Sequence, residues 1–236
     1  MIILHTNDFH NRMPPRAAEH IKKSKADMQA VLLDAGDAIS AGNIVYNPCE
    51  PILEKMTSIG YDAMCMGNRE FHFTRVGFET KVKDAGFPVL CANVHPKHEG
   101  DRPVVDWIML ERGDKKIAVA GLTVPMITPT MKSAMVSSWL FEPPLQAARR
   151  VASAVMLEKP DLLVFLTHIG IAQDRLLANA VPKIDLIIGG HTHTTLETGE
   201  RVNNTLIVQT GAYCRNLGIV DWNTETGELT ARLEAL

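Results

Sequence analysis

The sequence has few cysteines, little net charge and no long apolar run, and each shortage excludes a class of protein. Its cysteines, Cys49, Cys65, Cys91 and Cys214, are scattered without C-x-x-C pairing, which favours free thiols in a reduced, cytoplasmic compartment. A net charge of −3 gives no reason to expect binding to nucleic acid or to an anionic membrane. No apolar stretch approaches the roughly 18 residues of a membrane-spanning helix.

The sequence also lacks anything that would divide it into parts. No Pro/Gly/Ser-rich linker, charge block or repeat interrupts its 236 residues, so we expect one domain over residues 1–236. An apolar segment with candidate site residues begins at once, which predicts a chain without a signal peptide. Assembly into a homo-oligomer stays open.

Apolar runs that predict strands alternate with amphipathic stretches that predict helices. Such alternation is typical of a mostly parallel sheet covered by helices, while residues 205–210, 217–223 and 228–234 predict consecutive antiparallel strands. We therefore expect an α/β fold of two mixed β-sheets with helices outside. The other predicted strands are 2–6, 30–35, 62–66, 88–92, 104–112, 115–122, 161–167 and 184–189, and the predicted helices are 16–25, 50–59, 74–84, 145–158 and 173–180.

Five of the apolar runs end in side chains that can bind a metal ion. In an open α/β sheet, ligands bind in the crevice beyond the carboxyl ends of the strands. Alternate residues of a strand share a face, so a D-x-H and an H-x-H pair at strand ends would each point two ligands the same way. The candidate metal ligands are Asp8, His10, Asp37, Asn68, His168, His191 and His193.

Seven ligands are too many for a single zinc ion, which usually takes three or four. The Asp37 carboxylate can bridge two ions, so we expect two divalent metals. Imidazole, carboxylate and amide ligands without a thiolate favour manganese first, with iron, zinc, cobalt or nickel as alternatives. Two such ions about 3.5–4 Å apart suit in-line displacement at phosphorus.

The sequence around these residues resembles the motif blocks of the calcineurin-like metallophosphoesterases, and within them the catalytic domain of the 5′-nucleotidases. The blocks follow the family's order over nearly the whole chain. They read Ile3-Leu4-His5-Thr6-Asn7-Asp8-Phe9-His10, Leu33-Asp34-Ala35-Gly36-Asp37, Gly67-Asn68-Arg69-Glu70-Phe71, Thr167-His168-Ile169-Gly170, Gly189-Gly190-His191-Thr192-His193-Thr194 and Gln209-Thr210-Gly211-Ala212-Tyr213 before Leu217-Gly218.

This resemblance implies the family's four-layer αββα sandwich and hydrolysis of small phosphoesters, nucleotides first, by a hydroxide that bridges two metals. Two alternatives stay open. One is a phosphodiesterase acting on cyclic nucleotides or other small diesters, and the other is a non-catalytic metal-binding interaction protein of the same fold. By analogy, Asp8, His10, Asp37 and His193 would hold one ion, and Asp37, Asn68, His168 and His191 the other.

Arg69 departs from the family pattern, which usually has a histidine after the asparagine. An arginine cannot act as a general acid, because its pKa lies above about 12, but it can still bind two phosphate oxygens. We therefore expect Arg69 to clamp the phosphate beside Asn68. His72 could donate the proton if a helix begins here, since residues three apart share a helix face. A capping or solvated His72 is the alternative.

Two further expectations concern parts of the chain outside these motifs. The C-terminal nucleotide-binding domain of the 5′-nucleotidases is predicted to be absent, so nucleotide specificity does not follow from the resemblance. Residues 123–144 contain several methionines and aromatics. They are expected to pack against the chain's own sheet, to line the substrate pocket or to contact another subunit.

Overall fold

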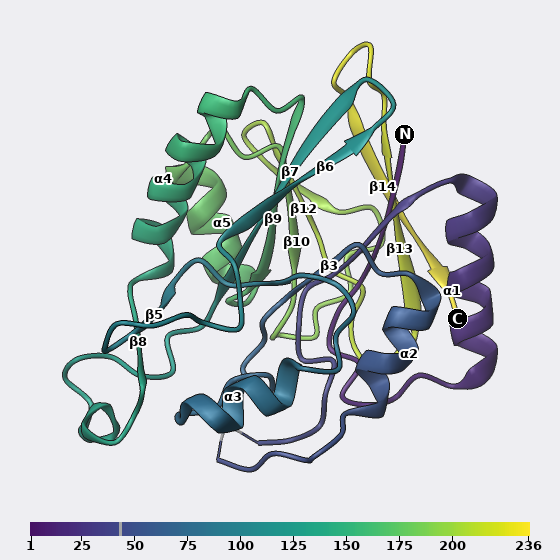
Figure 1. The fold of residues 1–236 in the computed structure, drawn as a ribbon. Helices are drawn as coiled ribbons and strands as arrows, with labels where there is room; N and C mark the ends of the chain where they lie inside the picture. Colours follow the sequence, from purple (N-terminus) through teal and green to yellow (C-terminus); the bar gives the residue numbers. More distant parts are fainter. Residues whose placement is uncertain (43) are drawn as a thin grey trace.

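The computed structural model describes residues 1–42 and 44–236, in which two six-stranded sheets, a two-stranded sheet and five α-helices occur (Figure 1). The strands are β1 (Ile2–Thr6), β2 (Val31–Asp34), β3 (Ala63–Cys65), β4 (Val89–Leu90), β5 (Val94–Pro96), β6 (Trp107–Arg112), β7 (Lys115–Thr123), β8 (Trp139–Phe141), β9 (Leu162–His168), β10 (Leu186–Gly189), β11 (Glu200–Val202), β12 (Thr205–Val208), β13 (Asn216–Trp222) and β14 (Leu229–Ala235). The helices are α1 (Pro15–Met28), α2 (Pro51–Ile59), α3 (Arg75–Val82), α4 (Pro144–Val155) and α5 (Ile171–Ala180).

Each large sheet combines parallel strands with antiparallel strands, which lie at one edge of the first sheet and at both edges of the second. The first has the order β14-β13-β1-β2-β3-β4, in which β1 to β4 run parallel and β13 and β14 pair antiparallel. The second has the order β11-β12-β10-β9-β7-β6, in which β12, β10, β9 and β7 run parallel. Both are therefore mixed sheets, as the sequence predicted.

Alternating side chains of the strands build the layers. In β1, Leu4 packs with the helices α1 and α2, whereas Ile3 packs into a separate core that also contains Val119 of β7. Alternate residues of a strand point to opposite faces, so this second core lies between the two sheets. Ala120 of β7 faces the other way, toward Val151 of α4. The order helices, sheet, sheet, helices confirms the predicted four layers (Figure 1).

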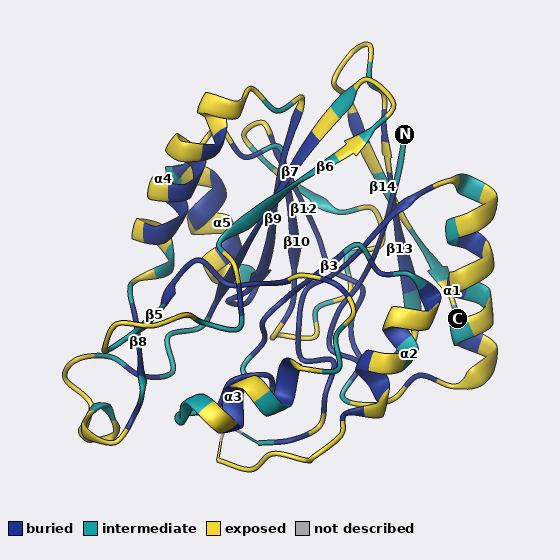
Figure 2. Cartoon of the chain, in the orientation of Figure 1, coloured by how far each residue is buried: buried dark blue, intermediate teal, exposed yellow. Residues whose placement is uncertain are grey.

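The helix ends follow local rules. Pro15, Pro51 and Pro144 stand at the first positions of α1, α2 and α4, where a missing backbone N–H costs nothing. Gly60 ends α2 with a φ of 92°, a conformation that glycine adopts without strain. The helices keep exposed outer faces over the buried sheets (Figure 2). No helix of the described chain is long and apolar enough to cross a membrane.

The second half of the chain agrees only partly with the sequence-based predictions. The predicted strands 104–112 and 115–122 correspond to β6 and β7, which form an antiparallel hairpin. The three consecutive antiparallel strands are wrong, because β12 pairs parallel with β10 in the second sheet and only β13 and β14 pair with each other. Within residues 123–144, Trp139 and Phe141 are buried in β8, whereas Met135 is 83% exposed, so the segment packs only partly against its own chain.

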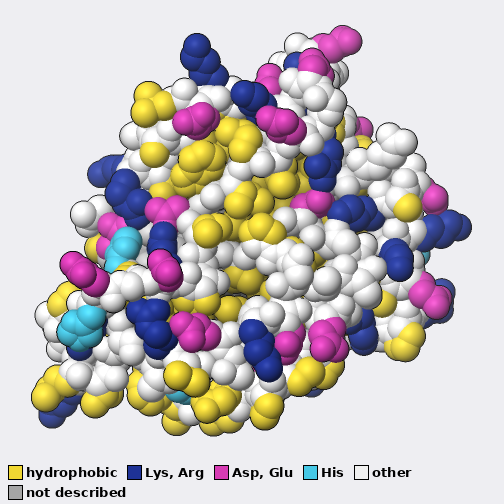
Figure 3. Space-filling view, in the orientation of Figure 1, with side chains coloured by type: hydrophobic (Ala, Val, Ile, Leu, Met, Phe, Trp, Pro, Cys, Tyr) yellow, Lys and Arg dark blue, Asp and Glu magenta, His cyan; other side chains and the backbone are white. Residues whose placement is uncertain are grey.

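The face shown in Figure 3 carries hydrophobic side chains over its centre, where β6 forms the edge of the second sheet. Trp107, Ile108, Met109 and Leu110 of β6 are half-buried. Exposed apolar side chains are common on protein surfaces, so these half-buried residues do not by themselves indicate an interface.

Candidate metal centre

The carboxyl ends of five parallel strands bring the predicted ligands to one edge of the two sheets. Three of these strands belong to the first sheet and two to the second. Asp8 and His10 follow β1, Asp37 follows β2, Asn68 follows β3, His168 ends β9, and His191 and His193 follow β10.

Two glycines set the spacing between the loops after β2 and β3. Gly36 has a φ of 92°, and a Cβ there would lie 2.6 Å from the backbone nitrogen of Gly67. A Cβ on Gly67 would in turn lie 2.3 Å from the backbone nitrogen of Asp37. Only glycine permits this backbone approach, and it places Asp37 beside Asn68.

Backbone hydrogen bonds then join the loop after β1 to its neighbours. The amide of Asp8 donates to the Gly36 carbonyl at 2.9 Å, and the amide of His10 donates to the Asp37 carbonyl at 2.9 Å. From the second sheet, the amide of His191 donates to Asp8 Oδ2 at 3.0 Å. Asp8 is therefore oriented from both sheets.

Glu70 serves the site through the backbone and not through a free carboxylate. Its oxygens accept hydrogen bonds from the amides of Gly67, Asp37 and Ile39 at 2.8, 3.0 and 3.2 Å. Burial and the nearby Asp37 raise the pKa of Glu70 to about 7, although these amides lower it. The side chain is completely buried, so it positions the two loops that carry Asp37 and Asn68.

His168 has the geometry of a metal ligand. Its Nδ1–H donates to the Ala35 carbonyl at 2.8 Å, which leaves Nε2 free. Metal-binding histidines usually donate their other ring N–H to such an acceptor. Nε2 lies 3.4 Å from Asp37 Oδ1 and 3.9 Å from Asp8 Oδ1. Burial opposes a charged ring, but Asp37 raises the pKa of His168 to about 9, so the carboxylates attract a cation to this position.

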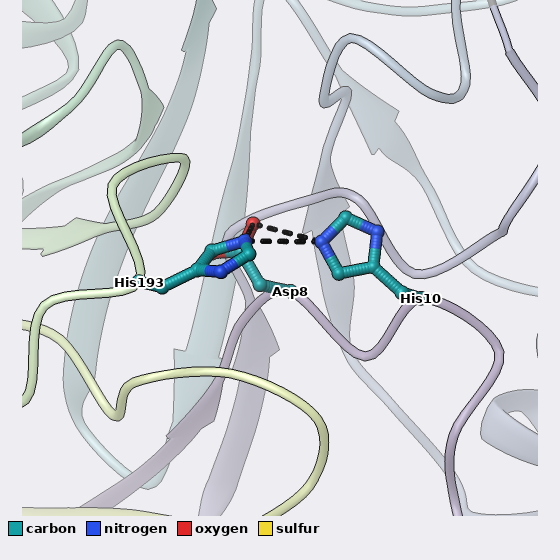
Figure 4. Close-up of side chains that lie close together, drawn as sticks. All are labelled: Asp8, His10 and His193. Carbon is teal, nitrogen blue, oxygen red and sulfur yellow. Dashed lines mark hydrogen bonds and ion pairs between the residues drawn. The ribbon is translucent and has the colours of Figure 1, made fainter.

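A second group forms around Asp8, His10 and His193 (Figure 4). His10 Nε2 and His193 Nε2 lie 3.1 Å apart, and each faces Asp8 Oδ1, at 3.7 and 3.2 Å. Asp8 Oδ1 and His168 Nε2 are buried without a hydrogen-bond partner in the described chain. Buried polar atoms are rarely left unpaired, so these residues fit a divalent cation. Asp8 belongs to both groups, whereas a bridging role for Asp37 stays a prediction.

The two remaining candidate ligands lie next to each other. His191 Nδ1 lies 3.0 Å from Asn68 Oδ1, and burial lowers the pKa of His191, which keeps the ring neutral. A neutral ring can use a lone pair for a metal ion. All seven side chains predicted as ligands are thus gathered at one place.

Backbone strain is concentrated at the same residues. Positive φ angles occur at five candidate ligands, which are Asp8, His10, Asp37, His191 and His193. Such conformations cost about 1 kcal/mol or more each in residues other than glycine, and they persist where a functional site requires them. The hydrogen bonds described above hold the loops in this strained arrangement.

These side chains open onto a cavity of about 400 Å³. It is lined by His10, Arg12, Asp37, Ser40, Asn68, Arg69, His191, His193 and Tyr213. The sequence reasoning did not single out Arg12, Ser40 or Tyr213 as site residues. Their only signal was proximity to a motif, two residues after His10, three after Asp37 and at the end of the last block.

Arg69 lines this cavity, and its role as a phosphate clamp stays a prediction. Its amide donates to Asp37 Oδ1 at 2.7 Å, and its guanidinium donates to the Ser40 carbonyl at 3.1 Å. The guanidinium Nε lies 3.9 Å from Asp37 Oδ2. The side chain is partly exposed, so donors remain free to face a bound anion.

His72 does not lie on a helix with Arg69, because α3 begins only at Arg75, so the helical premise for a proton donor is wrong. The His72 ring packs on Gly77, where a Cβ would lie 2.1 Å from Nδ1. The amide of Thr74 donates to Nδ1 at 3.1 Å. His72 is 5% exposed and is not among the described residues that line the cavity, so a catalytic role for it stays a prediction without geometric support.

Comparison with known proteins gives a family match over most of the chain. The model of the calcineurin-like phosphoesterase family matches residues 1–195. The trifunctional nucleotide phosphoesterase protein YfkN of Bacillus subtilis is 32% identical over 94% of this chain and 18% of its own length. A 5′-nucleotidase of Vibrio cholerae is 31% identical over 97% of this chain and 50% of its own length.

A crystal structure of the calcineurin-like phosphoesterase YfkN from Bacillus subtilis shares the fold. The TM-score is 0.81 at 21% identity, covering 100% of this chain and 90% of that one. The chain spans half the length of the Vibrio relative and less than a fifth of the Bacillus protein. The comparisons therefore establish the family and the fold of this chain.

Proposed function

This chain belongs to the calcineurin-like phosphoesterase family, and we propose that it hydrolyses small phosphoesters, nucleotides first, with two divalent metal ions. One observation carries the proposal above the others. Asp8 Oδ1 and His168 Nε2 are buried, have no hydrogen-bond partner among residues 1–42 and 44–236, and lie close to further ligand atoms. A scaffold without chemistry has no need for such costly groups.

We assign the ions to the seven side chains described above. Asp8, His10, Asp37 and His193 would hold one ion, and Asp37, Asn68, His168 and His191 the other. When bound, divalent ions supply an activated water at neutral pH and neutralise charge on the phosphoryl oxygens. Every ligand lies at the end of a sheet strand or on the short loop after it, so the scaffold holds the ligands in position before the substrate arrives.

The chain's own residues bind and orient the substrate. The Arg69 guanidinium can donate two hydrogen bonds to phosphoryl oxygens and offset the charge that grows in the transition state. The hydrogen bond from the Arg69 amide to Asp37 Oδ1 connects Arg69 to the loop that carries Asp37. Arg69 has no proton to give at neutral pH, so a leaving group must depart as an anion or take its proton from solvent.

Replacing Arg69 by histidine is expected to favour poor leaving groups. A correctly placed general acid is worth about 10²–10⁴-fold for a leaving group that needs a proton. We expect the ratio of kcat/KM for an alkyl phosphate to that for 4-nitrophenyl phosphate to rise about tenfold or more. Arg149→His, on the exposed face of α4, is the matched control. If kcat/KM changed by the same factor for both substrates, the native chain would not lack a proton donor that histidine supplies.

Metal analysis and turnover measured on one preparation test the proposed function. We expect two ions per chain after manganese loading and hydrolysis of 4-nitrophenyl phosphate and nucleoside monophosphates. Faster hydrolysis of bis(4-nitrophenyl) phosphate would favour the phosphodiesterase alternative. Two tightly bound ions without turnover on any ester would favour an interaction protein. Manganese as the native metal, a cytoplasmic location and a homo-oligomer stay predictions.

A further inference from the structure

Arg12 is a cation beside the metal centre that the proposed chemistry does not use. It is exposed at the rim of the cavity and takes part in no ion pair within the described part of the chain. Its guanidinium carbon lies 4.5 Å above the centroid of the Tyr213 ring. A guanidinium over a ring face is held by attraction to the π-electrons, which leaves the N–H groups at its edge free for an anion.

Tyr213 is itself fixed against the candidate ligands. Its ring centroid lies 5.4 Å from those of both His10 and His193, and its amide donates to the Asp8 carbonyl at 2.9 Å. Tyr213 and Cys214 have φ angles of 61° and 58°, so two successive residues adopt a strained conformation. The amide hydrogen bond and the packing against the two histidine rings offset this strain and hold the Tyr213 ring under Arg12 at the wall of the cavity.

The two arginines of the cavity contact different residues around the metal centre. Arg69 lies with Asp37 and Ser40, whereas Arg12 lies on Tyr213 beside His10 and His193. A phosphoryl group held by the metals and Arg69 leaves the guanidinium of Arg12 without a partner. A substrate with one anionic group would not use it.

We propose that Arg12 on Tyr213 forms a second anion subsite, which selects substrates whose leaving group carries its own phosphate, such as nucleoside diphosphates. This inference rests on the proposed function and specifies its substrate. Arg12 would bind the phosphate that leaves while Arg69 binds the phosphoryl group that is transferred.

The absence of a proton donor at Arg69 points to the same class of substrate. Water adds to the terminal phosphorus, the bond from that phosphorus to the bridging oxygen breaks, and the proton of the water passes to solvent. The products are orthophosphate and the nucleoside monophosphate. A leaving phosphate, with a second pKa of about 6, departs as an anion without a proton, whereas an alkoxide is about as basic as hydroxide. A guanidinium at Arg12 stabilises that departing charge directly.

Arg12→Gln tests the subsite by comparing two substrates in the metal-loaded protein. We expect kcat/KM for a nucleoside diphosphate to fall about 10- to 100-fold, the effect of losing a charge-assisted hydrogen bond. The value for 4-nitrophenyl phosphate, which has one anionic group, should change less than about threefold. Arg12→Lys should recover part of the loss. Arg16→Gln, an exposed arginine of α1, should change neither value.

The outcomes separate the subsite from the proposed function. An equal fall in kcat/KM on both substrates, or no fall on the nucleoside diphosphate, would contradict the subsite. Hydrolysis by the native chain would in that case still support the proposed function. A native chain that hydrolyses neither substrate with two bound ions would overturn both. Thermal unfolding of each variant, expected to match the native chain because Arg12 is exposed, shows that a loss reflects binding and not misfolding.

Discussion

Replacing Asp37 by asparagine is expected to lower kcat/KM by about 10³-fold or more. Loss of a single group that stabilises the transition state has an effect of about this size. Asp37 is the carboxylate proposed to serve both ions, and an amide oxygen carries no charge to neutralise them. The fold should survive, because an asparagine Oδ1 can still accept the hydrogen bond that the Arg69 amide donates at 2.7 Å.

Metal content and kinetics together measure this effect. We expect Asp37→Asn to retain fewer than two manganese ions after dialysis and to unfold within about 1 kcal/mol of the native chain, as an isosteric change usually does. Asp27→Asn, on the exposed face of α1, is the matched control and should keep both ions. An Asp37→Asn protein with two ions and native turnover would show that this aspartate is not a shared ligand.

The gathering of the candidate ligands could be predicted because it depends on one general rule of α/β folds. Parallel strands end at a common edge, so Asp37 after β2 and His168 at the end of β9 lie close although 130 residues separate them, as the 3.4 Å between their side chains shows. The rule needs only the strand positions and not their order. For this reason the errors in strand pairing did not affect the prediction.

The order of the strands was harder to predict than their positions. The buried run of β12 has no polar alternation that would say which neighbour it joins, since both of its faces are covered. It runs parallel to β10 and antiparallel to β11, with Asn203 at a φ of 53° in the two-residue turn between β11 and β12. The Asn203-Asn204 pair is a hairpin signal that the sequence reading passed over.

The supporting residues of the site were missed for a different reason. Arg12 and Lys81 act through long side chains that reach other loops, and no sequence spacing reports such a reach. Glu70, in contrast, lies inside a motif block, where its carboxylate accepts hydrogen bonds from backbone amides, and the side chain of Thr74 caps α3.

Lys81 is the most unusual of these residues, because it is a completely buried lysine. Its Nζ donates to the carbonyl oxygens of Gly42, Arg69 and Phe71 at 2.6, 2.7 and 2.7 Å. Burial lowers the pKa of Lys81 to about 8, so the amine is still protonated at pH 7. One side chain of α3 thereby ties together the two loops that flank the cavity.

Replacing Lys81 by methionine is expected to destabilise the protein by about 2–4 kcal/mol. The lowered pKa shows that burial of the ammonium costs more than its surroundings return, and methionine removes this cost. Methionine also leaves three carbonyl groups without their donor, however, at about 1–3 kcal/mol for each buried and unsatisfied group. The cost of three unsatisfied carbonyl groups is larger than the gain from removing the buried charge, because the hydrogen bonds of Lys81 already offset part of the cost of burying its ammonium group.

Urea unfolding of Lys81→Met measures this loss of stability. The matched control is Lys83→Met, because Lys83 is an exposed lysine two residues away, and it should change stability by less than about 0.5 kcal/mol. The loop that carries Arg69 should also move, because Lys81 no longer donates to its carbonyl groups. We therefore expect kcat/KM of the folded variant to fall about tenfold, as when a substrate-binding group is displaced. A Lys81→Met protein as stable and active as the native chain would show that the carbonyls find other partners. In that case the loops of the cavity would be held by Glu70 and the paired glycines alone.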